Sequence, residues 1–591
     1  MPAQKTGKYK LLKWIGGILG VIILILAIAA FYISAKWKPV LTEKIKSTVY
    51  EGSNHLYRIN FTDLHINLLT GTAAMDSVSL SADTAVFNTL RKNGKAPVHL
   101  FELKMKQLKL TRIGILTAYF KKRINMNAII LDRPSINMLH FNVPKKTDTV
   151  KDDKTLYQMI SKSLESIHIR TIKVLYADFD YLSGERRIVL NRVKNLNVNV
   201  TDLLIDSASQ FDAKRFYYTK DVEFEMSGYK SVTKDKMYTM TMDSLKGSAA
   251  DGIVNIKNFK MIPNYPDLTF SRKYSHQKDR YDLSFNRISL KGFDFVRFNT
   301  EALVYARSAK IGPAKVNVFM NRELPPPTFN KGRNYPQIAL QRLEQPLIID
   351  SVKLNNVDVA YTEYNPITKE RGTVHIDNLN GNLLNVTNND DQKAKHGHML
   401  AKLSAVIMNA PINININFNL LAKDGAFHYS GDIGALNMVS LNPLAESLGL
   451  VKIESGQVQK ADFDVQANLY GSTGSMHLYY TNLKVQLLKE GENGAPMKKR
   501  GFLSFLANTF VVKDSNPTKG DPVRTGNIKF ERTPAASFFN LLWKGIFIGI
   551  RETVGIGAIK PKSPEGAFKK VQAKQADRKA DNKKDKDKKS D

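Results

Sequence analysis

The stretch Pro411-Ile-Asn-Ile-Asn-Ile-Asn-Phe-Asn-Leu420 alternates apolar and polar residues without a break. Successive side chains of a β-strand point to opposite faces, so one face of this stretch is apolar and the other carries asparagines. One apolar face and one wetted face are typical of antiparallel sheet. The stretch therefore predicts an antiparallel strand whose apolar face, formed by Ile412, Ile414, Ile416 and Phe418, must be covered by something.

The same alternation recurs in three other segments. It runs through Asn195–Val200, Phe101–Met105 and Val357–Tyr361. After Met105 the apolar phase moves by one residue, to Leu108, and such a shift indicates a β-bulge. A parallel α/β fold would instead show continuous apolar strands between long amphipathic helices, and only short helical segments occur here. We therefore predict a mainly β protein with an extensive antiparallel sheet and a few short helices.

Two segments of the chain resemble each other without gaps. Ile172–Tyr181 matches Val352–Tyr361, and an Asn-rich strand follows each of them, from Asn195 and from Asn378. A linker rich in Pro and Gly, residues 324–336, separates the two copies. The match favours an internal repeat over unrelated domains. The alternative is a chance similarity between two ordinary strands.

Residues 14–35 carry no charge and lie between Lys13 and Lys36. As a helix this run would be roughly 33 Å long, enough to cross a hydrocarbon core of about 30 Å. The alternative is a signal peptide cleaved near Ala27–Ala29, but the apolar run is longer than a usual signal sequence. We predict a transmembrane anchor with residues 1–13 in the cytoplasm. Its expected membrane contacts are Trp14, Ile18, Ile22, Leu26, Phe31 and Trp37.

Residues 534–558 predict a hydrophobic helix with Pro534 in its first turn. Its uncharged run, residues 533–543, is too short to span a bilayer. Two interpretations are open: the helix plugs the end of the β structure, or it lies against a membrane or a partner protein. The residues expected to make that second contact are Phe538, Phe539, Leu542, Trp543 and Phe547. Residues 560–591 alternate Lys and Asp without apolar content and predict a disordered tail.

The composition excludes several classes of protein. The chain has 591 residues, with 87 Lys+Arg against 55 Asp+Glu and a formal charge of +32. The basic residues are densest at the two ends, so the middle is mildly basic and carries no concentrated patch for nucleic acid. It has no cysteine, which excludes disulfides, thiolate metal sites and a cysteine nucleophile. We expect no nucleic-acid partner.

No motif of catalysis stands out. The sequence has no G-x-x-x-x-G-K-[ST], no H-E-x-x-H, no G-x-S-x-G and no G-x-G-x-x-G. His396 and His398 are close in sequence, but they lie in a polar segment with no further ligand nearby. We predict a protein that is not an enzyme and that needs no metal and no cofactor.

Several short motifs follow one another in a fixed order over most of residues 10–555. They are Trp37–Pro39, Ile59–Leu68, Thr70–Gly71, Arg133–Ile136 within Ile124–Met138, Leu441–Pro443, Ile453–Gly456, Phe463–Val465, Gly471–Tyr480 and Ser537–Asn540 with Trp543 and Lys544. In this order they resemble the AsmA-like family, which is related to the TamB- and YhdP-type bridge-like lipid transfer proteins, and its Bacteroidota-type members in particular. Each motif is short, so the specificity of the resemblance lies in their order.

The resemblance implies a fold and a place in the cell. The fold would be an elongated antiparallel sheet curled into a groove that is apolar inside, anchored in the bacterial inner membrane and extending into the periplasm. Residues 36–325 would form the N-terminal part of this groove and residues 326–533 a C-terminal module. The predicted lining of the groove, taken from the alternating strands, is Phe101, Leu103, Met105, Leu196, Val198, Val200, Val357, Val359, Ile412, Ile414, Ile416 and Phe418.

Two functions remain in competition. In the first, the groove binds the acyl chains of phospholipid, at about 0.8 kcal/mol per buried CH₂ group, and supports phospholipid transport toward the outer membrane. The C-terminal helix would then meet the outer membrane or an envelope protein. In the second, the apolar faces close on one another, and the protein is a structural or assembly factor for outer-membrane proteins or envelope complexes. Ile414→Asp should impair function without unfolding in the first case, and should unfold the protein in the second.

Overall fold

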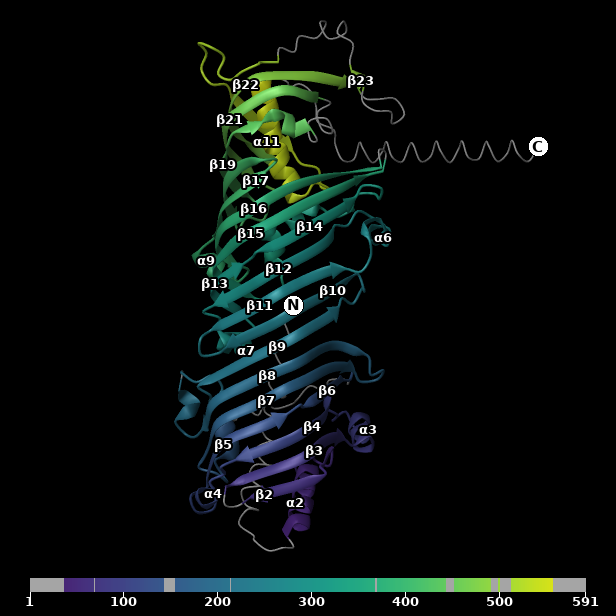
Figure 1. Cartoon of the computed structure of the whole chain (residues 1–591), viewed down its shortest axis with the longest axis vertical. Helices are drawn as coiled ribbons and strands as arrows, with labels where there is room; N and C mark the ends of the chain where they lie inside the picture. The colour runs from purple at the N-terminus through teal and green to yellow at the C-terminus, as the bar shows by residue number, and fades with distance from the viewer. Residues whose placement is uncertain are drawn as a thin grey trace, which may run out of the picture. The chain divides into compact units, whose positions relative to one another are not determined.

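The computed structural model describes residues 37–67, 70–142, 155–212, 214–366, 369–442, 451–489, 498–499 and 512–555. Strands make up 55% of it and helices 18%, and the strands form a large curled antiparallel sheet (Figure 1), so the predicted mainly β class is confirmed. The predicted anchor, residues 14–35, and the predicted tail, residues 560–591, lie outside the described residues. Within the described part of the chain, no helix combines the length and the apolar character that a membrane crossing requires.

The chain divides into two compact units, which are described separately. The first holds the chain up to Val232, together with Met240–Asn258 and Ser289–Ala302. The second holds Thr233–Thr239, Phe259–Ile288 and the chain from Leu303 onward. The expected boundary at residues 325/326 therefore falls inside the second unit.

The first unit begins with α2 and contains the first nine strands. Its elements are α2 (Trp37–Gly52), β1 (Tyr57–Asn60), β2 (Asp63–Asn67), β3 (Thr72–Ala82), α3 (Thr84–Lys92), β4 (His99–Thr111), α4 (Ile115–Lys121), β5 (Arg123–Asp132), β6 (Ser135–His140), α5 (Leu156–Ile160), β7 (Ser166–Ser183), β8 (Val189–Ile205), η1 (Ser209–Phe211), β9 (Asp221–Val232) and α7 (Phe295–Glu301). Residues of both units contribute to β10 (Tyr238–Ser248), β11 (Ile253–Pro263) and β12 (Arg280–Lys291).

The second unit ends in the longest helix of the described chain. Its elements are α6 (Asp267–Ser271), β13 (Val304–Ile311), β14 (Ala314–Asn321), η2 (Lys331–Asn334), α8 (Pro336–Gln341), β15 (Leu347–Asn365), β16 (Glu370–Thr387), α9 (Asp390–Lys395), β17 (His398–Ile407), β18 (Ala410–Asn419), β19 (Phe427–Ile433), β20 (Leu436–Asn437), η3 (Met438–Leu441), β21 (Val451–Ala467), β22 (Gly471–Lys489), β23 (Lys498–Lys499), β24 (Thr525–Glu531) and α11 (Phe538–Val554).

The alternating residues from Pro411 to Asn419 lie in strand β18. Its Ile412, Ile416 and Phe418 are buried, and its asparagines point to the wetter face. Ile416 lies opposite Ala401 of β17 and Tyr429 of β19, so apolar residues meet across both neighbouring pairs. The period of two therefore predicted both the strand and its buried face.

The predicted phase shift in β4 is present and is shared with its neighbour. Met105 lies opposite Val78 and Leu108 lies opposite Met75, and all four side chains are buried. Between them, Ser77 of β3 has a φ of 49°. Because both strands change phase together, their apolar residues stay on one face while the strands bend, as β-bulges commonly make strands do.

The sequence repeat is a repeat of structure. In each copy a strand is broken before a proline: β5 and β6 are separated at Pro134, and β13 and β14 at Pro313. Both parts of each broken strand pair in parallel with one long strand, β7 in the first copy and β15 in the second. Parallel neighbours need a crossover connection. The two crossovers, residues 141–165 and 322–346, are equal in length.

The two copies also share the same side-chain hydrogen bonds. In the first, Tyr176 N donates to Asn197 Oδ1 at 2.9 Å and Asn195 N donates to Asp178 Oδ1 at 3.1 Å. In the second, the equivalent bonds are Asn356 N to Asn380 Oδ1 at 2.9 Å and Asn378 N to Asp358 Oδ1 at 3.0 Å. The four donors have positive φ, from 47° to 54°, so each bond stabilises a kink that L-residues otherwise disfavour. This shared geometry confirms the predicted repetition.

A second bend in β8 depends on a charged network around Asp202, whose φ is 57°. Its carboxylate meets His168 Nε2 at 2.7 Å, Arg215 Nη2 at 2.9 Å and Lys220 Nζ at 3.0 Å. Burial opposes ionisation of Asp202, but the hydrogen bonds from these three residues outweigh it and hold its pKa well below the usual range. The network fixes the strand where it carries Val200 and Leu203 on the same face.

Asp202→Asn should therefore destabilise the protein in a pH-dependent way. A carboxyl group whose pKa is depressed by folding stabilises the fold above its unfolded pKa, near 3.9, and loses this effect as the pH falls. We expect the loss in the free energy of unfolding, measured by urea denaturation, to be smaller at pH 3 than at pH 7 by about 1 kcal/mol. Equal effects at both pH values would show that the charge of Asp202 contributes nothing.

Candidate functional site

Part of the predicted lining belongs to a closed core in the first unit. Met105 of β4 is buried, and Phe101 and Leu103 pack against the same cluster. Ile45 of α2 and Phe87 of α3 belong to that cluster as well. These three strand residues therefore pack against protein side chains.

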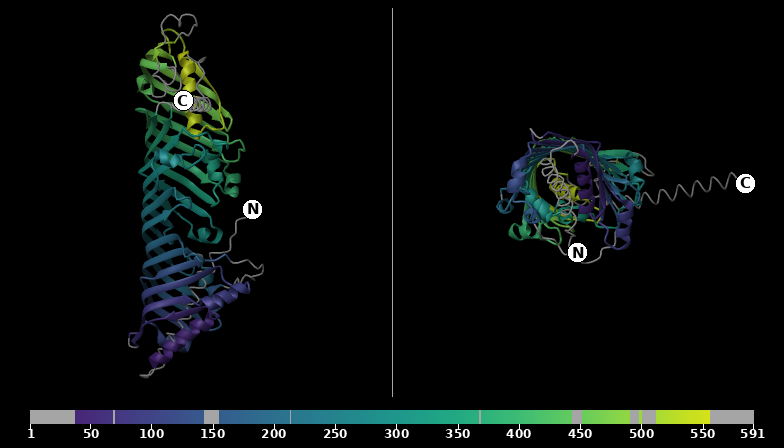
Figure 2. Two further views of the ribbon diagram at one scale, coloured as in Figure 1. Left: turned by 90° about the vertical axis from the view of Figure 1, so that its right-hand side faces the viewer. Right: turned by 90° about the horizontal axis from the view of Figure 1, so that it is seen from below.

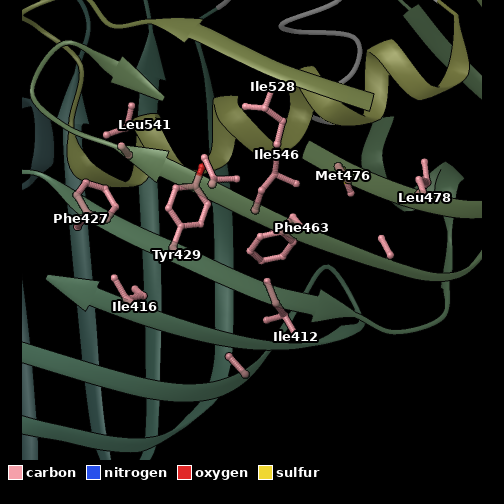
Figure 3. Close-up of a cluster of buried hydrophobic side chains, with 14 of the residues drawn as sticks. Ile412, Ile416, Phe427, Tyr429, Phe463, Met476, Leu478, Ile528, Leu541 and Ile546 are labelled. Carbon is pink, nitrogen blue, oxygen red and sulfur yellow. The ribbon is translucent and has the colours of Figure 1, made fainter. Parts of the chain in front are cut away.

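A second part of the predicted lining belongs to the core of the second unit. Ile412, Ile416 and Phe418 are buried there, and Ile414 packs against the same cluster. Figure 3 shows Ile412, Ile416, Phe427 and Tyr429 on the strands, on the side from which Leu541 and Ile546 of α11 approach. The apolar face of β18 is thus covered by the chain itself.

The helix that covers it begins later than predicted. Pro534 precedes the helix, because α11 starts at Phe538 with Ser537 as its N-cap, whose Oγ accepts a hydrogen bond from Asn540 N at 3.3 Å. Such a cap satisfies one of the backbone amides in the first turn of the helix, which have no partner within the helix. In Figure 2 the yellow helix lies within the curve of the green strands, and it packs on β22 and β24. The helix therefore packs on strands that precede it in the chain and contributes to their core.

A buried arginine fixes the turn that leads into α11. Arg532 donates from Nη2 to Ala536 O at 2.7 Å and from Nη1 to Leu469 O at 2.9 Å. Its guanidinium lies 5.2 Å from the ring centroid of Tyr335, which belongs to the second crossover. The burial of Arg532 lowers its pKa. The arginine therefore joins the turn before the helix, the end of β21 and the crossover.

The aromatic residues of α11 divide between its two faces. Phe538 and Leu542 pack against the core, where the ring of Phe538 meets those of Tyr335 and Phe427, both at 5.4 Å. Phe539 is 48% exposed. Trp543 and Phe547 are half-buried, with ring centroids 5.3 Å apart. Of the five residues predicted to contact a membrane or partner, two are in the core and three form a stripe at a spacing of four residues.

The remaining lining residues of the first unit belong to neither core. Leu196, Val198 and Val200 of β8 are half-buried, and no core cluster of the described residues includes them. Val200 lies opposite Ile172 and Val222, and Val198 opposite Val174 and Phe224. Three neighbouring strands thus present one apolar surface, here named the β7–β9 surface: Ile172, Val174, Ala177, Leu196, Val198, Val200, Val222 and Phe224.

The opposite face of these strands is polar, so the two faces are chemically distinct. Asn197 lies opposite Glu225 and Asn199 opposite Glu223. Asn199 Nδ2 donates to Glu223 Oε2 at 2.8 Å. The strands are therefore wetted on one side and apolar on the other, as their alternation predicted.

The second unit has a matching apolar surface beside its core. Val359 of β15 lies opposite Val316 of β14 and Ile376 of β16, and Tyr361 lies opposite Val318 and Val374. All six are half-buried, and only Ile376 packs against a core of the described residues. Val357 is buried at the edge of this surface. We name it the β14–β16 surface: Val316, Val318, Val357, Val359, Tyr361, Val374 and Ile376.

The sequence prediction missed several members of the two surfaces. Val316 and Val318 alternate with charged or polar residues, and Phe224 does so with Glu223 and Glu225. A period of two could have found them, but their runs are shorter than that of β18. Lys544 was also missed as a candidate, although it is the one charged residue between Phe538 and Ile550.

The other candidate features of the described residues do not form an alternative functional site. His398 Nδ1 lies 2.7 Å from Asn417 Oδ1 on the polar side of the strands. Among the described residues no group of three or more His, Asp or Glu could hold a metal ion. A hollow of about 350 Å³ lies beside the first repeat, lined by Arg133, Pro134, Ser135, Tyr176, Asp178 and Asn195. Its mixed polar wall does not suit an acyl chain.

No protein-family model and no curated protein matches this chain. The function is therefore inferred from the geometry of the apolar surfaces.

Proposed function

We propose that this protein binds lipid acyl chains on the apolar faces of its antiparallel sheet and supports phospholipid transport between the membranes of a bacterial envelope. The observation that carries the proposal is that the β7–β9 and β14–β16 surfaces belong, almost entirely, to neither closed core of the described chain. Apolar surface that lies outside the closed cores marks a ligand or partner site.

Hydrophobic burial alone gives these surfaces enough affinity for a lipid tail. Each CH₂ group removed from water contributes about 0.8 kcal/mol. Valine, isoleucine and phenylalanine provide such contacts without any hydrogen bond, so the tail could slide along the strands while the headgroup stays in water. Binding of this kind requires no catalytic residue, no metal and no nucleic acid, and we propose a protein that is not an enzyme.

The rest of the chain has a role in this proposal. Residues 14–35 would anchor the protein in the inner membrane, with residues 1–13 in the cytoplasm and the sheet in the periplasm. The resemblance to AsmA-like proteins supports the same arrangement. The exposed Phe539, with Trp543 and Phe547, would form the surface of α11 that meets lipid, the outer membrane or an envelope protein.

One observation favours the alternative of an assembly factor. Ile412, Ile416 and Phe418, the clearest alternating strand of the sequence, form part of a closed core. A protein whose two apolar surfaces were also covered, by a partner protein, would hold envelope components together without carrying lipid. The two functions therefore differ in what touches the β7–β9 surface.

Photocrosslinking along β8 separates the two functions. A photoreactive phenylalanine analogue would replace Val198 or Val200 on the apolar face, and Asn199 on the polar face, one position at a time. We expect ultraviolet light to attach phospholipid, identified by mass spectrometry, at Val198 and Val200 only. Protein adducts at these two positions without lipid would instead support the assembly factor. Equal lipid adducts on both faces would mean contact with the bulk membrane, which contradicts binding on the apolar face.

A further inference from the structure

The β14–β16 surface ends at a group of charged residues. Glu363 is two residues beyond Tyr361 on the same face of β15, opposite Met320 of β14. The carboxylate of Glu363 is ion-paired with Arg322, and these side chains remain 27% and 31% exposed. Tyr361 Oη donates to Glu363 Oε1 at 3.0 Å. A strand rises about 3.3 Å per residue, so the charged row lies about 7 Å beyond the row of Tyr361.

Two buried lysines complete this group. Lys331 of the crossover and Lys544 of α11 are each only 6% exposed. Lys331 Nζ donates to Met320 Sδ at 3.4 Å, and the same sulfur accepts a hydrogen bond from Tyr361 Oη at 3.7 Å. Lys544 Nζ lies 5.4 Å from the ring centroid of Phe530. Among the described residues, neither ammonium has a carboxylate within ion-pair distance.

The charges around these lysines do not balance. Arg322 and Glu363 both act electrostatically on Lys544, whose pKa is lowered by burial first and by Arg322 second, while Glu363 raises it. Asp279, which precedes β12, acts on Tyr361 together with Glu363. Three cations thus face two acids. A buried ammonium without a counter-charge is costly, and an anion that reached it would remove much of that cost.

We propose that Lys331, Lys544 and Arg322 bind the phosphate group of a phospholipid whose acyl chains lie on the β14–β16 surface. The inference rests on the proposed function and specifies its substrate class as phosphate-bearing lipids. Ammonium and guanidinium groups form short, charge-assisted hydrogen bonds to phosphate oxygens. Because the side chains of Arg322 and Glu363 are partly exposed, the headgroup can reach these cations from water. The adjacent valines would hold the tail.

Binding assays on the full-length protein in mild detergent test the cluster. The probes are dioleoylphosphatidylglycerol, dioleoylglycerol with the same tails and no phosphate, and inorganic phosphate. We expect Lys544→Met and Lys331→Met each to weaken binding of phosphatidylglycerol at least tenfold and to leave binding of dioleoylglycerol unchanged. Lys529→Met, which removes the same charge from an exposed position of β24, is the control and should change neither.

The outcomes distinguish the cluster from the apolar surface. Unchanged phosphatidylglycerol binding in both lysine variants would overturn the inference, whatever dioleoylglycerol does. Binding of inorganic phosphate alone, lost in Lys544→Met, would assign the cluster to a soluble phosphate compound and overturn its lipid part. If the wild-type protein bound neither lipid, the proposed function itself would fail. Misfolding is not expected, because an apolar residue of similar length in place of an unpaired buried charge is often neutral or stabilising.

Discussion

Replacing Val198 by aspartate is expected to reduce the phospholipid bound to the purified protein at least tenfold while the protein stays folded. Val198 lies in the middle of the β7–β9 surface and is half-buried, opposite Val174 and Phe224. A carboxylate there can turn toward water, so the cost to folding is small. The same carboxylate would have to be desolvated against an acyl chain, which strongly disfavours binding. Native mass spectrometry measures the bound lipid, and circular dichroism measures the fold.

Two matched variants make this result interpretable. Asn197→Asp adds the same charge one residue away on the polar face of β8 and should leave lipid binding unchanged. Val465→Asp places the carboxylate in the closed core of the second unit, where Val465 is fully buried, and should cost several kcal/mol in the free energy of unfolding. If Val198→Asp unfolded the protein as Val465→Asp does, the β7–β9 surface would be a closed core and the proposed function would be wrong.

Replacing Gly526 by valine should destabilise the second unit by about 3 kcal/mol. Gly526 of β24 faces α11 at a very close approach, since an added Cβ would lie 2.2 Å from Gly549 O and 2.4 Å from Thr553 Oγ1. Because the first of these atoms belongs to the backbone, the helix itself would have to move. That movement would open the core around Met476 and Ile528, both of which face Gly549.

Urea denaturation and limited proteolysis check this prediction. Gly372→Val on β16 is the control, because no atom lies within 4 Å of the added Cβ and the residue is exposed. We expect Gly526→Val to lower the free energy of unfolding and to make the α11 region sensitive to protease, with Gly372→Val close to wild type. Equal stability of the two variants would mean that α11 does not dock on β24.

The sequence predicted the strands better than it predicted what covers them. The alternating runs of β8 and β18 look alike, since both place apolar residues between asparagines. Alternation reports only that one face is apolar. The face of β18 is covered by α11, which follows it by more than a hundred residues, whereas Leu196, Val198 and Val200 of β8 are in neither core cluster of the described chain. Such long-range coverage is a property of the tertiary fold, and no local pattern encodes it.

At the candidate site, too, the local pattern did not show which individual apolar residues are covered. The sequence predicts Leu196, Val198, Val200 and Val359 as lining together with Met105 and Ile416, but the first four are in neither core cluster of the described chain and the last two are in cores. In the sequence, Lys544 interrupts the apolar residues of the helix. In the structure its side chain is buried. Its neighbours Arg322 and Glu363 come from two other segments, so only the folded chain brings the three together.

The most direct test of the account is the lipid content of the full-length protein, purified from bacterial membranes and measured by native mass spectrometry with lipid extraction. The account predicts that phospholipid co-purifies with the wild-type protein in defined stoichiometry and that the Val198→Asp protein carries none. A folded, monodisperse protein without lipid would contradict it, and would leave the two apolar surfaces to a protein partner.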